Sequence, residues 1–175
     1  MSVIAVFGDS VASTDSKDYK TALKIGELFA KNGYDIATGG YGGVMEAALK
    51  GAYDHNVQTI GVMFLDETER KRNKYVRNVV EVKTYLDRLQ HLIYIADAFL
   101  VLPGGTGTLL ELTAIWALKE RNLLGNKPIV CIGEQWQEVI ETMEFYSEKI
   151  MEATHFISHT DSLDEALGIV NGSIK

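Results

Sequence analysis

The chain has 175 residues, of which 46% are hydrophobic and 23% are charged, and its formal net charge at pH 7 is −7. This composition excludes a disordered chain and is typical of one globular domain, which buries roughly 70% of the surface that its unfolded form exposes and needs no disulfide or metal to hold its core. The acidic balance argues against a broad surface for DNA or RNA, and because no window approaches about 18 uninterrupted apolar residues, no membrane span is expected.

Short runs rich in β-branched and aromatic residues alternate along the chain with stretches of helical spacing. In chain order, the expected elements are strand Val3–Phe7, helix Tyr19–Lys31, strand Tyr34–Thr38, helix Val44–His55, strands Thr59–Phe64 and Val79–Val82, helix Tyr85–Ala96, strand Ala98–Leu102, helix Leu109–Arg121, strand Ile129–Ile132, helix Trp136–Glu152, and a final helix Thr160–Val170 with Asp161 or Ser162 as its N-cap. Several strands are continuously apolar, as strands covered on both faces are. The alternation predicts a Rossmann-like α/β fold, a three-layer sandwich with a mostly parallel sheet and helices on both faces. Residues 1–175 are expected to form a single nucleotide-binding domain.

The cysteine content and the first residues predict a cytoplasmic location. Cys131 is the single cysteine of the sequence, so it forms no disulfide within the chain. The start, MSVIAVFGDS, lacks the basic region and the long apolar stretch of a signal peptide. We therefore expect the protein in the cytoplasm.

Three loops are expected at the carboxyl edge of the sheet, where open parallel sheets bind their ligands. They are residues 8–10 after the first strand, 39–43 after the second, and 103–108 after the strand that ends at Leu102. One glycine cluster alone indicates a tight turn. Two glycine-rich loops, each between a strand and a helix, leave backbone N–H groups and a helix N-terminus exposed, and this favours a phosphate site. The residues expected to contact the ligand are Gly8, Ser10, Gly39, Gly40, Gly42, Gly43, Gly104, Gly105, Thr106, Gly107 and Thr108.

Two well-known nucleotide fingerprints are missing from these loops. The first strand is followed by Gly-Asp-Ser-Val-Ala instead of G-x-G-x-x-G, and no loop ends in Gly-Lys-Ser/Thr. An NAD-dependent oxidoreductase and a P-loop NTPase are therefore disfavoured.

Two charged residues near the loops each allow two interpretations. Glu111 follows Thr108 by three residues, so the pair matches a capping box, but a glutamate in the first turn of an anion-binding helix would also lie beside the ligand. Arg88 belongs either to the solvated face of a helix whose leucines, Leu86 among them, pack inward, or to the site. Spacing alone does not decide between these interpretations.

The run Pro103–Glu111, PGGTGTLLE, resembles the P-G-G-x-G-T-x-x-E signature of the LOG (LONELY GUY) family, phosphoribohydrolases that cut cytokinin riboside monophosphates. Arg88, fifteen residues before Pro103, falls where that family has the arginine of its M-H-x-R-K segment. The resemblance extends from residue 3 to about residue 133 and includes Met45 and Glu46, which it adds to the expected substrate contacts.

The resemblance implies roles for these residues. Arg88 and Glu111 would act on the N-glycosidic bond while the glycine loops hold the 5′-phosphate. Glu111 would orient or activate water and stabilise the positive charge that builds up on the ribose, and Arg88 would fix the phosphosugar or assist the departing base. A homodimer is also implied, with helices Tyr85–Ala96 and Leu109–Arg121 packed across the two-fold axis.

The sequence departs from the family pattern at several positions. Tyr85 and Leu86 stand where the family has Met and His, and Leu89 stands where it has Lys. The loop 39–43 is shorter than that of the family and is similar to the loop of molybdenum-cofactor carrier proteins, which bind a pterin phosphate without cleaving it. The label of lysine decarboxylase, often given to this group, is rejected because no lysine that could form a Schiff base lies among the loops.

We therefore expect a nucleoside 5′-monophosphate phosphoribohydrolase that acts on a cytokinin-type nucleotide or AMP. The alternative is a non-catalytic nucleotide or molybdenum-cofactor binding and carrier protein. The expected partner is a small-molecule nucleotide. Neither a nucleic acid nor a membrane is expected as a partner, and no cofactor or metal is expected. His155 and His159 have the spacing of helical metal ligands, but no carboxylate completes a set with them.

Overall fold

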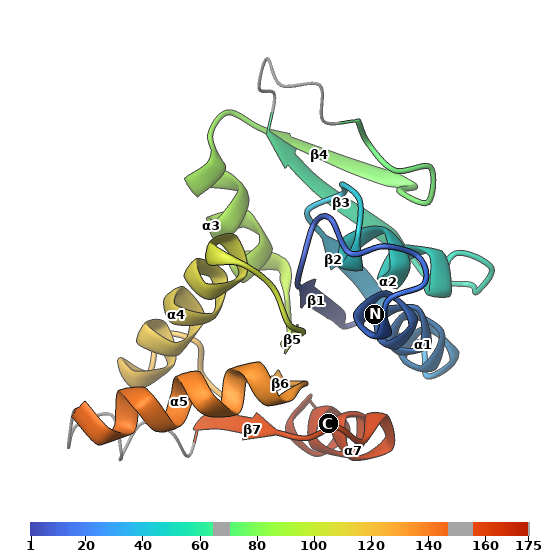
Figure 1. Ribbon diagram of the computed structural model, residues 1–175. Helices are drawn as coiled ribbons and strands as arrows, with labels where there is room; N and C mark the ends of the chain where they lie inside the picture. Colours follow the sequence, from blue (N-terminus) through green and yellow to red (C-terminus); the bar gives the residue numbers. More distant parts are fainter. Residues whose placement is uncertain (65–70, 147–155, 175) are drawn as a thin grey trace.

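The computed structural model describes residues 1–64, 71–146 and 156–174, which form a seven-stranded sheet between two layers of helices (Figure 1). The strands are β1 (Val3–Phe7), β2 (Asp35–Thr38), β3 (Thr59–Phe64), β4 (Asn78–Val82), β5 (Ala98–Val101), β6 (Ile129–Cys131) and β7 (Ile157–His159). The helices are α1 (Lys17–Lys31), α2 (Val44–Ala52), α3 (Tyr85–Ile95), α4 (Thr106–Glu120), α5 (Glu134–Tyr146) and α7 (Leu163–Ile174). The predicted Rossmann-like α/β fold is confirmed.

The sheet is parallel, and its strand order is β4-β3-β2-β1-β5-β6-β7. The chain leaves β1 toward β2, β3 and β4 on one side and returns to β5 on the other side. The order of the strands therefore reverses between β1 and β5, and at such a point the loops at the carboxyl ends separate and leave a crevice for a ligand.

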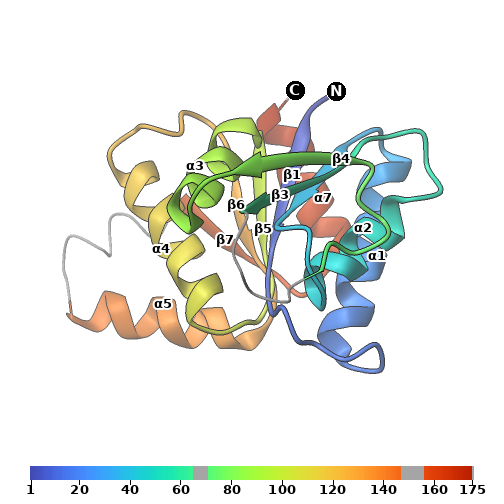
Figure 2. The same ribbon diagram turned by 90° about the horizontal axis from the view of Figure 1, so that it is seen from above.

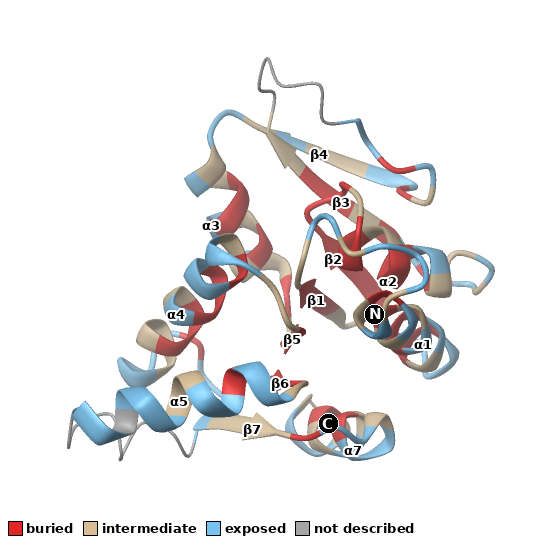
Figure 3. Ribbon diagram, viewed as in Figure 1, coloured by how far each residue is buried: buried red, intermediate tan, exposed pale blue. Residues whose placement is uncertain are grey.

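Alternating side chains of the central strands fill two separate cores. Ile4 and Val6 of β1 pack with α1, α2 and α7, whereas Ala5 and Phe7 pack with α3, α4 and α5 (Figure 2). All four side chains are at most 1% exposed. Buried residues are concentrated in the strands and on the helix sides that face them (Figure 3). This two-sided burial explains why the strands are continuously apolar in the sequence.

Most element boundaries differ from the prediction by one to three residues. Helix α1 begins at Lys17 because the hydroxyl of Ser16 accepts a hydrogen bond from the backbone N–H of Tyr19. Of the two candidate caps of the last helix, Ser162 is the one whose hydroxyl accepts from the N–H of Glu165. Residues 156–158 were expected to form a strand or a loop, and strand β7 lies there. The last part of the expected helix Trp136–Glu152, from residue 147 on, lies outside the described residues.

None of the helices within the described ranges combines the length and the apolar character that crossing a membrane requires.

Candidate active site

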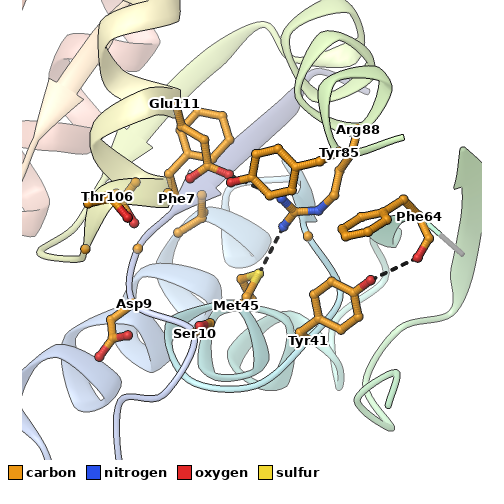
Figure 4. A pocket seen from close by; sticks show the side chains of 16 residues that line it. Phe7, Asp9, Ser10, Tyr41, Met45, Phe64, Tyr85, Arg88, Thr106 and Glu111 are labelled. Carbon is orange, nitrogen blue, oxygen red and sulfur yellow. Dashed lines mark hydrogen bonds and ion pairs between the residues drawn. The ribbon is translucent and has the colours of Figure 1, made fainter. Parts of the chain in front are cut away.

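A cavity of about 340 Å³ lies at the carboxyl ends of β1, β2 and β3 and beside the N-terminus of α4 (Figure 4). Its size is at the lower end of the range that is typical of small-molecule sites. The wall is formed by Val6, Phe7, Gly8, Asp9, Ser10, Gly39, Tyr41, Met45, Phe64, Tyr85, Arg88, Gly105, Thr106, Gly107, Thr108 and Glu111. The cavity therefore occupies the point where the strand order reverses.

Arg88 of α3 extends into this cavity and is only 5% exposed. Its Nε donates to the carbonyl oxygen of Val62 at 3.0 Å, and Nη2 lies 3.4 Å from the sulfur of Met45. Nη1 lies 3.5 Å from Oε1 of Glu111. Of the two interpretations of Arg88, the one that places it on the solvated face of the helix is wrong, because it is Leu86, at 65% exposure, that faces outward.

Gly39 leaves the space that the guanidinium occupies. A Cβ atom at this position would overlap Nη2 of Arg88 and would crowd the sulfur of Met45. The glycine after β2 is therefore required by the close approach of the arginine side chain and not by a turn.

The guanidinium of Arg88 has more donors than acceptors around it. It carries five N–H groups, but among the described residues only the carbonyl oxygen of Val62 accepts from it at ordinary hydrogen-bond distance. The thioether of Met45 is a weak acceptor, and Glu111 is 3.5 Å away. The terminal nitrogens can therefore bind an anionic or carbonyl-bearing ligand in the cavity.

Glu111 lies in the second turn of α4 and is 6% exposed. Burial raises the pKa of its carboxyl group from 4.5 to about 7, and the guanidinium of Arg88 opposes this rise. Near neutral pH the group is therefore present both as an acid and as a base, as a general acid or base requires.

The capping-box interpretation of Glu111 is wrong. Helix α4 begins at Thr106, with Gly105 as its N-cap, so Thr108 lies inside the first turn and does not precede the helix. Among the residues that the structure describes, no side chain forms a capping hydrogen bond at this terminus. Its first backbone N–H groups have no acceptor within the helix, and together with the helix dipole they favour an anion at this end of the cavity.

Backbone hydrogen bonds join the three predicted loops to one another. Asp9 donates its N–H to the carbonyl oxygen of Pro103 at 3.1 Å and accepts from the N–H of Val44 at 2.8 Å. Gly43, which precedes Val44, has a φ of 64°, and a Cβ atom there would overlap the carbonyl oxygen of Asp9. The loops after β1, β2 and β5 therefore form one connected rim.

Two carboxamide side chains outside the cavity hold the glycine loops. Asn73 donates from Nδ2 to the carbonyl oxygens of Gly40 and Tyr41, at 3.0 and 2.7 Å. The side chain of Gln135 in α5 forms hydrogen bonds with both backbone groups of Gly104. Its Oε1 accepts from the N–H of Gly104 at 3.1 Å, and its Nε2 donates to the carbonyl oxygen of Gly104 at 2.8 Å.

The structure brings most of the predicted site residues into the cavity wall but not all of them. The predicted residues that line it are Gly8, Ser10, Gly39, Met45, Arg88, Gly105, Thr106, Gly107, Thr108 and Glu111. The predicted residues that do not line it are Gly40, Gly42, Gly43, Glu46 and Gly104. The glycines among the latter shape the loops. Glu46 lies near Tyr19 of α1, where its charge adds to the effect of burial and raises the pKa of the tyrosine.

Sequence reasoning missed the aromatic part of the wall. Tyr41 lies inside the predicted glycine loop, Phe64 ends β3, and Tyr85 precedes Arg88 by three residues and therefore shares its face of α3. Only the departure of Tyr85 from the LOG pattern could have drawn attention to any of them.

Within the part of the chain that the structure describes, no group of three or more histidine, cysteine, aspartate or glutamate side chains could hold a metal ion. Of the two histidines considered above, His155 lies outside the described residues, and the ring of His159 forms a hydrogen bond with the carbonyl oxygen of Gly133 at 3.1 Å.

Comparisons of the sequence identify related proteins over most of the chain. The family model of the SLOG cluster4 family (LDcluster4) matches residues 1–159. An uncharacterized protein of Archaeoglobus fulgidus is 31% identical over 140 residues, which cover 74% of this chain and 83% of that protein. A cytokinin riboside 5′-monophosphate phosphoribohydrolase of Mycobacterium marinum is 29% identical over 170 residues, which cover 90% of this chain and 88% of that enzyme.

Solved structures with the same fold include molybdenum-cofactor proteins. The molybdenum cofactor binding protein of Rippkaea orientalis has a TM-score of 0.78 and 23% identity, with 99% of this chain and 98% of that chain covered. A Moco carrier protein of Chlamydomonas reinhardtii has a TM-score of 0.72 and 18% identity, with 99% and 97% covered. Both resemblances expected from the motifs, to the LOG enzymes and to the carriers, are therefore confirmed.

Proposed function

The chain belongs to the SLOG cluster4 family, and we propose that it is a nucleoside 5′-monophosphate phosphoribohydrolase, which releases the free base and ribose 5-phosphate. One observation carries the proposal: Arg88 and Glu111, both buried, lie 3.5 Å apart in the wall of a cavity whose rim is made of glycine loops and an uncapped helix N-terminus. The relative in Mycobacterium marinum, named as a cytokinin riboside 5′-monophosphate phosphoribohydrolase, supports the same reaction class.

The phosphate of the nucleotide would bind at the N-terminus of α4. Thr106 at the start of this helix and Ser10 from the neighbouring loop both line the cavity, so their hydroxyl groups and the first N–H groups of the helix are the proposed phosphate ligands. Direct hydrogen bonds from these groups would supply most of the affinity, because the helix dipole alone contributes only about 0.3–2 kcal/mol.

Cleavage breaks the bond between C1′ of the ribose and the base nitrogen, and the bonding electrons leave with the base. The ribose then resembles an oxocarbenium ion, which the ionised carboxylate of Glu111 stabilises electrostatically. Water adds to C1′, and its proton goes to Glu111. The departing nitrogen takes up one proton from solvent, and Arg88 either stabilises the negative charge that develops on the base or holds the phosphosugar in place.

The test is to incubate the full chain with AMP, GMP, IMP, CMP and UMP and to separate free bases by chromatography. We expect base release from at least one nucleotide, and we expect Arg88→Lys to lower kcat by about 10²-fold or more, because lysine lacks the planar fork of donors. Arg121→Lys is the matched control, since this arginine is exposed on the far end of α4. Release by Arg88→Lys at the rate of the control would contradict the assigned role.

A carrier that binds without cleavage is the second candidate function. Its support is the likeness of the fold to molybdenum-cofactor proteins over nearly the whole chain. If calorimetry shows binding of a nucleotide or pterin phosphate while no base is released from any nucleotide, the carrier function replaces the hydrolase.

We also propose a homodimer that forms through α3 and α4. Leu86 and Tyr94 of α3 are 65% and 82% exposed, and Leu109 and Leu110 of α4 are 37% and 40% exposed. Both helices cover the same face of the sheet, so a second copy of the chain could bury these apolar side chains together.

A further inference from the structure

The hydroxyl group of Tyr85 reaches the first turn of α4 from the neighbouring helix α3. Tyr85 is the first residue of α3, and its ring extends toward α4 (Figure 4). A Cβ atom at Gly107, the second residue of α4, would lie 3.1 Å from the tyrosine oxygen. Because the Cβ of a helical residue tilts toward the N-terminus of its helix, the hydroxyl lies on the side of Gly107 that faces the free N–H groups of α4.

The backbone and the ring of Tyr85 are both held in place. Thr84 and Asp87 form a capping box around the start of α3, with hydrogen bonds of 3.1 and 3.0 Å between each side chain and the backbone N–H of the other residue. The ring meets that of Phe64 edge to face, with centroids 5.8 Å apart. On the ring, the centroid lies 5.6 Å from the central carbon of the Arg88 guanidinium. The hydroxyl is therefore positioned before a ligand binds.

Several polar groups in this wall of the cavity have unused hydrogen-bonding capacity. Among the residues that the structure describes, neither the hydroxyl of Tyr85 nor that of Thr108 forms a hydrogen bond with another residue. Thr108 is only 4% exposed and lines the cavity, as Tyr85 does, and a buried hydroxyl without a partner costs free energy. The terminal nitrogens of Arg88 face the same cavity with few acceptors around them. All these groups can donate hydrogen bonds, so they favour a ligand rich in acceptors, such as a phosphate group.

The hydroxyl of Tyr85 is a feature that the LOG pattern does not include. Tyr85 stands where that pattern has Met, and a thioether sulfur cannot donate a hydrogen bond. The donor therefore comes from this chain's own sequence and lies outside the glycine loops.

We propose that the hydroxyl group of Tyr85 is a ligand of the phosphate and donates a hydrogen bond to it from α3, beside the N–H groups of α4. This inference rests on the proposed function, in that it takes the N-terminus of α4 as the phosphate site. It adds a donor from a second helix, and with it a selection of phosphorylated over unphosphorylated ligands.

The test uses Tyr85→Phe, which keeps the ring and removes only the hydroxyl. Ribose 5-phosphate is the probe, because the proposed reaction releases it and does not consume it. Isothermal titration calorimetry at pH 8, where the phosphate is a dianion, should show binding that is about tenfold weaker than that of the wild type or weaker still, as expected for a hydrogen bond to a charged group. Tyr94→Phe, which changes an exposed tyrosine of the same helix, is the matched control and should bind as the wild type does.

Two further measurements identify what the hydroxyl contacts. In phosphorus NMR spectra at saturating ribose 5-phosphate, the resonance of the bound ligand should shift in Tyr85→Phe and stay unchanged in Tyr94→Phe, because the lost hydrogen bond is made to the phosphate itself. In urea, Tyr85→Phe should be as stable as the wild type, because the hydroxyl has no partner among the described residues. A loss of stability would show that the hydroxyl serves the fold instead.

Equal affinity of Tyr85→Phe and the wild type would overturn the assignment. Weaker binding with an unchanged phosphorus resonance would also overturn it, since the hydroxyl would then contact the ribose, and so would a wild type that does not bind ribose 5-phosphate. Failure of the proposed function is a separate result: if no nucleotide releases its base but the affinity for ribose 5-phosphate depends on the Tyr85 hydroxyl, the phosphate ligand stands and the hydrolase does not.

Discussion

Burial affects the protonation of Glu111 more strongly than its cationic neighbour does. The guanidinium of Arg88, 3.5 Å away, favours the carboxylate, yet the pKa is raised to about 7 because the side chain is removed from water. A carboxyl group with this pKa can act as a base in a cell at neutral pH, and it also makes the folded state sensitive to pH.

The stability of the protein should therefore fall as pH rises through the range between the unfolded and folded pKa values of Glu111. Between 4.5 and about 7, the native state keeps a proton that the unfolded state has already lost. The free energy of unfolding of the wild type, relative to that of Glu111→Gln, should thus decrease by about 2 to 3 kcal/mol from pH 5 to pH 8. Urea unfolding of both proteins at several pH values measures this difference, and a constant difference would contradict the assigned burial of the charge.

Replacing Gly39 should displace the arginine. In Gly39→Ala the new methyl group overlaps Nη2 of Arg88, so we expect a loss of about 1–3 kcal/mol in the free energy of unfolding together with weaker nucleotide binding. Gly168→Ala in α7 is the control, because a Cβ atom there meets no neighbour within 4 Å and alanine is favoured in a helix by about 0.5–1 kcal/mol. Equal stability of the two variants, measured by chemical denaturation, would show that Arg88 does not need this space.

Arg88 and Glu111 could be picked out from the sequence, but two interpretations of each residue stayed open. The decision depends on tertiary contacts: α4 starts three residues earlier than expected, and α3 turns Arg88 rather than Leu86 toward the sheet. Phe64 carried no signal, because a phenylalanine at the end of a buried strand is ordinary core composition.

Helix α5 contributes to the site without touching the cavity. Gln135→Met keeps the size of the side chain and removes both hydrogen bonds to Gly104, which precedes the N-cap of α4. We expect a rise of roughly tenfold in the KM for nucleotide with a smaller change in kcat, since the proposed phosphate contacts of the loop would be made in both the ground and the transition state. Gln137→Met is the matched control, because its amide pairs with Glu141 on the same helix. Equal kinetic effects of the two substitutions, or a fall in kcat without a change in KM, would contradict a role in phosphate positioning.

Elements with a strong hydrophobic periodicity were predicted well. Short strands, and helix starts that depend on the N-cap, were predicted less well. Strands β1 and β3 have the expected bounds, and the apolar run of β1 ends at Gly8. Strand β7 is only three residues long, Ile157–His159, and its pairing with β6 is a long-range contact that local patterns do not contain. The start of α4 was misplaced because a glycine N-cap carries no side-chain signal.

At the scale of the whole molecule, the fold follows from the alternation of strands and helices, whereas the reaction does not. A protein named as a Moco carrier shares the fold of this chain, and a protein named as a phosphoribohydrolase is similar to it in sequence, so the fold alone does not decide the function. In this chain, Arg88 and Glu111 lie where the strand order reverses, beside a rim of backbone amides.

The proposed dimer predicts a mass in solution of twice 19.4 kDa at micromolar concentration. Tyr94→Glu places a charge among the exposed apolar side chains of α3 and should shift the mass to that of one chain, whereas Phe145→Glu on α5 should leave it unchanged. Light scattering after size exclusion measures both. A wild-type mass of one chain across this concentration range would contradict the dimer.

The most direct test of the account is the rate at which Glu111→Gln forms ribose 5-phosphate from a purine nucleoside monophosphate at pH 8, compared with Glu120→Gln. The two glutamates belong to the same helix, but only Glu111 lines the cavity. We predict a loss of about 10²–10⁴-fold in kcat for Glu111→Gln and wild-type activity for Glu120→Gln. Ribose 5-phosphate formed at equal rates by the two variants would contradict cleavage by the Arg88–Glu111 pair.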